Sequence, residues 1–248
     1  MNYKFLLQFV NCLFAFTLDA QPTFWKDESK EQLAHVFDQM RTWHVLHTDY
    51  TITITHASFE NYTTTIPYEK STGYYRKVND SYHSFLLGIH TIQNEKYKII
   101  LDTAGQTLMV ANIDHSIWSA YTIEDYGYLL KACVATKVLN SGMDNRYRLE
   151  YGEGYPLDSY EMLVSGEGFL KEMVWYYRTD VPKDIDNEDS EKTKPRLSIT
   201  FSSFKKYQHV IADDEFDFTK YFKVVGNKLI PVGKYKDFTL SDQRLTLD

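Results

Sequence analysis

The chain has 248 residues and a formal net charge of −7, and 16% of its residues are aromatic, with 20 tyrosines among them. This length suffices for one large domain or two small ones. The negative charge argues against a nucleic-acid-binding protein, which needs a basic stripe along the phosphates, and it does not favour adsorption to anionic lipid headgroups.

Residues 1–20 are predicted to be a signal peptide. Lys4 precedes an apolar run at 5–18, which has the length of a signal peptide and is too short to cross a bilayer comfortably. Cleavage after Ala20 would leave 21–248 as the exported chain. A buried N-terminal helix and an uncleaved anchor are the alternatives.

The clearest helix is predicted at 26–47, where apolar residues recur every three or four positions. These residues are Leu33, Val36, Phe37, Met40 and Trp43. The opposite face of the helix is polar, so this helix needs a sheet on which to lie.

Strand patterns follow. A β-branched run at 50–59 alternates Thr with Ile, and strand-like segments continue at 62–78, 81–94 and 97–113. Their spacing predicts consecutive hairpins whose neighbours in sequence are neighbours in the sheet. The hairpin at 97–113 turns at Gly105 and has apolar residues on both faces. A sheet with one wet face would alternate apolar and polar residues, so the second face of this hairpin needs a cover.

A second helix is predicted at 122–139, with Thr122 and Asp125 in the positions of a capping box. Its apolar stripe would consist of Leu129, Leu130, Cys133, Val134 and Val138. Cys12 belongs to the predicted signal peptide, so Cys133 would have no partner for an intramolecular disulfide. A lone thiol in an apolar segment is expected to be an inert core residue.

Further strands are predicted at 146–151, 159–165, 168–178 and 196–204. The polar, acidic stretch at 179–195 is interpreted as a solvated loop, and the tail is expected to add a hairpin around Gly226 and Asn227. This order of elements predicts an α+β fold, with one large curved antiparallel sheet and the helices on a single side.

No catalytic, metal or cofactor site is predicted. His44 and His47 are three residues apart and lack the Glu of a zinc-binding helix. The acidic run at 184–189 has Asp189 where a calcium loop of the EF-hand type needs Gly. Leu163 replaces the first Gly of a nucleophile elbow, so a hydrolase is the least favoured function.

The apolar sheet leaves two interpretations open. One face can pack on the helices, and the other can line a cavity for an apolar ligand, because a large exposed apolar patch would be a liability. Alternatively, side chains of the protein itself fill both faces.

Two blocks of the sequence resemble the periplasmic outer-membrane lipoprotein carrier (LolA/LolB-like) superfamily. The first is a Gly-led strand with Gly73, Arg76 and Lys77, and the second is the hairpin at 97–113. The residues of this hairpin that match are Asp102, Gly105, Thr107, Leu108 and Val110. The resemblance spans roughly residues 25–205. The tail, together with the block at 196–207, suggests a Bacteroidota-type branch.

The resemblance implies an incomplete β-barrel in which helices form a lid over an apolar cavity. On this basis, 21–248 is expected to be a single domain with a C-terminal extension from about 205, and to act as a monomeric, noncatalytic periplasmic carrier. The expected ligand is a lipid or a lipoprotein acyl chain. Six residues are predicted to line its site: Phe85, Leu86, Ile99, Leu101, Leu108 and Val110. The alternative is an envelope protein-interaction module with a filled core and no ligand.

Overall fold

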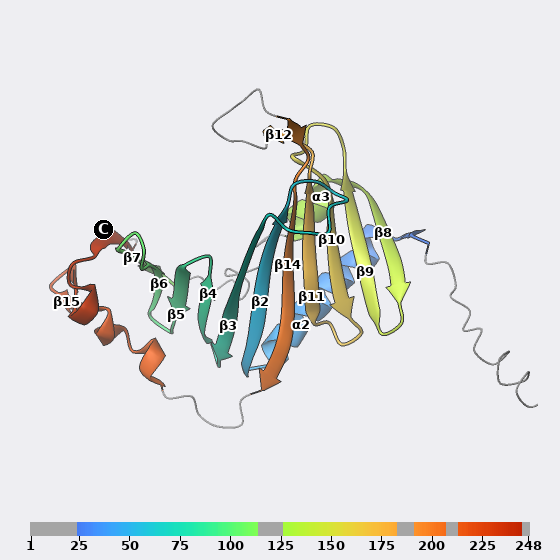
Figure 1. Ribbon diagram of the computed structural model, residues 1–248. Coiled ribbons are helices and arrows are strands. Elements are labelled where there is room, and N and C mark those ends of the chain that lie inside the picture. The colour runs from blue at the N-terminus through green and yellow to red at the C-terminus, as the bar shows by residue number, and fades with distance from the viewer. Residues whose placement is uncertain (1–23, 114–125, 183–190, 207–212, 245–248) are drawn as a thin grey trace, which may run out of the picture.

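The computed structural model describes residues 24–113, 126–182, 191–206 and 213–244 (Figure 1). Its main feature is one sheet of thirteen strands, in the order β1-β8-β9-β10-β11-β14-β2-β3-β4-β5-β6-β7-β17. The strands are β1 (Lys26–Asp27), β2 (Asp49–Phe59), β3 (Glu69–Val78), β4 (Ser81–Leu86), β5 (Ile89–Gln93), β6 (Tyr97–Asp102), β7 (Thr107–Asn112), β8 (Cys133–Ser141), β9 (Asp144–Tyr151), β10 (Leu157–Ser165), β11 (Leu170–Tyr177), β14 (Arg196–Lys206) and β17 (Thr239–Gln243).

All neighbouring strands of this sheet are antiparallel except β17, which pairs in parallel with β7. The sheet is curved and does not close, and helices α2 (Lys30–Leu46) and α3 (Tyr126–Ala132) lie over the same face (Figure 1). The predicted α+β fold, with one curved antiparallel sheet and helices on one side, is therefore confirmed. The predicted hairpins between 50 and 113 are also confirmed, because β2 to β7 pair consecutively.

Helix α2 begins at a side-chain cap. The hydroxyl of Ser29 accepts a hydrogen bond from the backbone N–H of Gln32 at 3.1 Å, which satisfies one of the free donors of the first turn. Its predicted apolar stripe faces the sheet, and every member of that stripe is at most 8% exposed. The stripe belongs to a first core between the helices and strands β2 to β4, β8 to β11 and β14.

A second core lies under the C-terminal segment. This segment consists of short helices η1 (Asp213–Phe216), η2 (Phe218–Lys220) and η3 (Gly233–Tyr235), and of the hairpin β15 (Phe222–Val225) and β16 (Lys228–Pro231). The predicted hairpin around Gly226 and Asn227 is confirmed. The segment packs on β5, β6 and β7 and then adds β17 to the edge of the sheet.

The two cores lie on opposite faces of the sheet. Successive residues of a strand point to opposite faces. Tyr82 of β4 belongs to the first core, whereas the next residue, His83, contacts Glu215 of the C-terminal segment. The helices therefore cover one face over β8 to β3, and the C-terminal segment covers the other face over β4 to β7.

The prediction of a helix over 122–139 is wrong beyond Ala132. The chain continues as strand β8, in which Val138 pairs with Tyr147 of β9, and Val134 is 68% exposed rather than part of a buried stripe. Thr136 and Val138 are β-branched and favour a strand, and pairing on both sides of β8 satisfies the backbone there. Thr122 and Asp125 lie outside the described residues.

The acidic stretch at 179–195 contains a short ladder. Strands β12 (Val181–Pro182) and β13 (Lys192–Thr193) pair with each other outside the large sheet, and residues 183–190 lie outside the described part. Cys133 is 3% exposed and free, as expected for a core residue of the described chain.

Candidate functional site

The residues predicted to line a ligand site are divided between the two faces of the sheet. Leu86 lies on the helix-covered face, at the edge of the first core. The other five lie on the opposite face, in register with one another across β4, β5, β6 and β7. Phe85 is half-buried, and its ring centroid is 4.6 Å from that of His90.

The remaining four predicted residues belong to the second core. Ile99, Leu101, Leu108 and Val110 are at most 2% exposed. They are covered by apolar residues of the C-terminal segment, namely Phe216, Phe218, Tyr221, Phe222, Leu229 and Tyr235. Side chains of the protein itself thus cover this face of the hairpin at 97–113, whereas Met109 on its other face is 37% exposed. Whether any of these four residues contacts a ligand stays a prediction.

A charged contact fastens the C-terminal segment to the sheet. The Arg76 guanidinium of β3 donates to Oε2 of Glu215 at 2.8 Å, and Nδ1 of His83 lies 3.1 Å from the same oxygen. Burial alone would raise the pKa of Glu215, but the hydrogen bonds with His83 and Arg76 and their charges lower it below its ordinary value. Nδ1 of His90 lies 3.0 Å from Nε2 of His83. Burial lowers the pKa of His90, and the charges of His83 and Lys234 lower it further.

The helix-covered face contains a different arrangement, in which tyrosine hydroxyls are buried in the first core. Tyr160 of β10 is 0% exposed and Tyr151 of β9 is 4% exposed. Neither hydroxyl has a hydrogen-bond partner among the described residues. Burial raises the pKa of both phenols, so both are neutral donors. A buried hydroxyl without a partner costs about 1–3 kcal/mol, so these two positions require an explanation.

The rings of these two tyrosines pack among apolar and aromatic side chains of the first core. The ring of Tyr160 lies 5.4 Å from that of Trp175, and Tyr151 stacks on Tyr155 at 4.3 Å. Tyr126 of α3 stacks on Phe37 of α2 at 3.9 Å and closes the layer from the side of the helices. The fully buried residues of this layer are Leu149, Met162 and Met173.

The cover over this layer is thin at α3. This helix has seven residues, and of these only Leu129 is buried. A helix of this length is not stable by itself, and its hold on the sheet depends on Leu129 and on the partly buried Tyr126, Leu130 and Ala132. An apolar layer with two hydroxyl donors under a small helical cover is the chemistry of a site for an amphiphilic molecule.

Tyr151 and Tyr160 were not singled out from the sequence, although the strands that carry them were predicted. The alternation of Tyr147, Leu149 and Tyr151 could have placed these residues on one buried face. No local pattern shows whether a buried hydroxyl has a partner, because a partner comes from another part of the fold.

Other kinds of site have less support in the described residues. Among them, no group of three or more His, Cys, Asp or Glu side chains is arranged to hold a metal ion. None of the helices in the described ranges is long and apolar enough to cross a membrane.

No family model and no curated protein matches the sequence. Solved structures similar to this chain include an uncharacterized conserved protein from Thermus thermophilus, with 10% identity over 86% of this chain and 99% of that chain and a TM-score of 0.46. A LolA superfamily protein from Nitrosomonas europaea has 6% identity over 74% of this chain and 96% of that chain, with a TM-score of 0.33. The lipoprotein LppX from Mycobacterium tuberculosis has 9% identity over 74% of this chain and 100% of that chain, with a TM-score of 0.38. At these values the similarities assign neither a family nor a ligand, and membership of a Bacteroidota-type branch stays a prediction.

Proposed function

We propose that the protein is a noncatalytic carrier that binds an apolar ligand, a lipid or a lipoprotein acyl chain, between the sheet and helices α2 and α3. The observation that carries this proposal is the burial of the Tyr151 and Tyr160 hydroxyls without a hydrogen-bond partner among the described residues. An ester or amide carbonyl of a lipid would accept hydrogen bonds from these hydroxyls, and its acyl chain would lie along the apolar layer.

The side chains around the two hydroxyls suit a ligand of variable shape. Met162 and Met173 are 0% exposed, and the thioether side chain of Met adapts to irregular space. Burial of acyl chain would drive binding by about 0.8 kcal/mol per CH₂ group. Displacement of α3, which contributes one buried residue, would open the layer for loading and release.

The chemistry of binding requires no covalent step. The proposed carrier therefore uses no catalytic residue, cofactor or metal. It acts after export to the periplasm, to which residues 1–20 direct it.

A second function, an envelope protein-interaction module, is favoured by the second core, in which C-terminal side chains fill the space over β5 to β7. The two functions differ in whether a lipid occupies the first core.

Native mass spectrometry of protein purified from membranes tests the proposal. The wild-type chain is expected to retain a lipid, and Tyr160→Phe is expected to retain less of it because one hydroxyl donor is lost. Tyr50→Phe is the matched control, since Tyr50 is also buried in the first core but its hydroxyl lies 2.6 Å from Nδ1 of His44. Wild-type protein without any lipid, or equal retention by all three proteins, would contradict the proposed site.

A further inference from the structure

The C-terminal segment has an acidic start, with Asp213, Asp214, Glu215 and Asp217, and a basic part after it. Residues 218–236 contain five lysines and neither Asp nor Glu, within a chain of net charge −7. These are Lys220, Lys223, Lys228, Lys234 and Lys236. Their side chains are all exposed. The excess of positive charge over residues 218–236 directs this part of the segment toward anionic surfaces.

The hairpin β15–β16 arranges part of this charge on one outer face. Lys223 pairs with Ile230 and Val225 pairs with Lys228, so these four side chains share a face. The opposite face carries Phe222 and Leu229, which are buried in the second core. The outer face therefore combines two ammonium groups with two aliphatic side chains.

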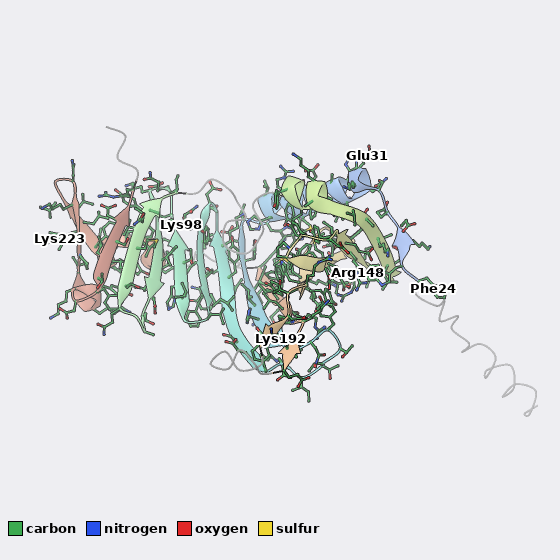
Figure 2. All side chains as sticks on the ribbon, turned by 90° about the horizontal axis from the view of Figure 1, so that it is seen from above. Phe24, Glu31, Lys98, Arg148, Lys192 and Lys223 are labelled. Atoms are coloured by element: carbon green, nitrogen blue, oxygen red, sulfur yellow. The ribbon has the colours of Figure 1, made fainter. Side chains whose placement is uncertain are left out.

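The described part of the chain covers these aliphatic groups only in part. Val225 is 53% exposed and Ile230 is 40% exposed, and the neighbouring Val224 is 50% exposed. Lys223 and Lys228 form no ion pair with any described residue. Figure 2 shows Lys223 at one end of the molecule and Phe24 at the other, so this face lies far from the N-terminal edge of the sheet.

We propose that the outer face of the β15–β16 hairpin docks on an anionic lipid surface. Lys223 and Lys228 would meet the headgroups, while Val225 and Ile230 enter the boundary between headgroups and acyl chains. The composition of the face favours lipid over an acidic protein, because the cores of protein interfaces are enriched in Tyr, Trp and Arg and depleted in Lys. This inference goes beyond the carrier function, because the hairpin can dock whether or not the first core holds a ligand.

Cosedimentation of the full chain with vesicles tests the docking face. The wild-type chain is expected to bind vesicles of 70% phosphatidylcholine and 30% phosphatidylglycerol better than vesicles of phosphatidylcholine alone, and to lose most of this difference in 0.5 M salt. Lys223→Glu with Lys228→Glu should weaken binding at least 25-fold, or about fivefold per lysine. Val225→Ser with Ile230→Ser should weaken binding but preserve its salt dependence.

Lys70→Glu with Lys131→Glu is the matched control. It changes the net charge equally, and both lysines are exposed, on β3 and α3. All variants retain residues 1–20, so any vesicle binding by that apolar run is common to them. Wild-type affinity in the Lys223 and Lys228 variant, or an equal loss in the control, would overturn the proposal. Capture of an acidic protein without vesicle binding would overturn it as well.

Discussion

Arg76 and Lys77 are adjacent in β3, and they secure two covers on opposite faces of the sheet. Nζ of Lys77 donates to the carbonyl oxygens of His44 at 2.8 Å and of His47 at 3.2 Å, at the end of α2. The guanidinium of Arg76 donates to Glu215 at the start of the C-terminal segment. One strand therefore anchors both the helix over the first core and the segment over the second core.

Replacement of Lys77 by Met is expected to lower the free energy of unfolding by about 1.5–3 kcal/mol. Lys77 is 7% exposed, and its ammonium group satisfies two carbonyl groups that have lost their helical partners. The measurement is chemical denaturation monitored by circular dichroism. Lys70→Met is the control, because Lys70 is exposed on the same strand and its replacement should change stability by less than about 0.5 kcal/mol.

The contact between Glu215, Arg76 and His83 predicts an acid-sensitive C-terminal segment. The folded state lowers the pKa of Glu215, so the unfolded state takes up the proton first as the pH falls. The stabilising contribution of Glu215 is therefore present above its ordinary pKa of 4.5 and is lost as the pH falls through the lower folded value. Glu215→Gln should lower stability at pH 7 by about 1–2 kcal/mol and show a weaker loss of stability below pH 5.

Hydrogen exchange locates this effect within the fold. In Glu215→Gln, the amides of Ile99 and Val110 should exchange faster, since their cover is less firmly held, while the amides of Val36 and Met40 should not change. Asp237→Asn is the control, because Asp237 is exposed in the same segment. Uniformly faster exchange in both cores would show that Glu215 stabilises the whole fold rather than this cover.

The strands and the first helix could be predicted because their signals are local. The period of α2 and the alternation of β2 to β7 depend only on which face of each element is buried. The same alternation placed Ile99 and Val110 on one face, but their cover consists of residues more than a hundred positions later. Whether Val138 lies in a helix or in a strand likewise depended on its pairing with Tyr147 of β9, since the residues of β8 also fit a helical period. Long-range pairing decided each of these cases.

Position 73 of β3 requires a residue without a side chain. A Cβ atom at this position would lie 1.8 Å from the carbonyl oxygen of Phe85 in β4, and backbone cannot move aside as a side chain can. Gly73→Ala should therefore lower the free energy of unfolding by about 1–3 kcal/mol or more, measured by denaturation. Gly152→Ala is the milder comparison, because its Cβ would meet only Cγ1 of Val134 at 3.3 Å. Equal stability of the two variants would show that β3 and β4 separate at little cost.

Loss of the hydroxyl of Tyr160 and loss of the hydroxyl of Tyr50 are expected to change the stability of the ligand-free protein in opposite directions. Tyr160→Phe removes a buried donor that has no partner among the described residues, so the delipidated variant should be more stable than wild type by about 1–3 kcal/mol. Tyr50→Phe removes a hydroxyl paired with His44 and should be less stable by about 0.5–1.5 kcal/mol. Denaturation of both proteins after delipidation measures the difference. Addition of a phospholipid should then stabilise the wild-type chain more than Tyr160→Phe, since a ligand that binds only the folded state stabilises it more when it binds more tightly. A Tyr160→Phe variant that is destabilised without lipid would show that its hydroxyl already has a partner, and the hydroxyl would then give no reason to place a ligand in the first core.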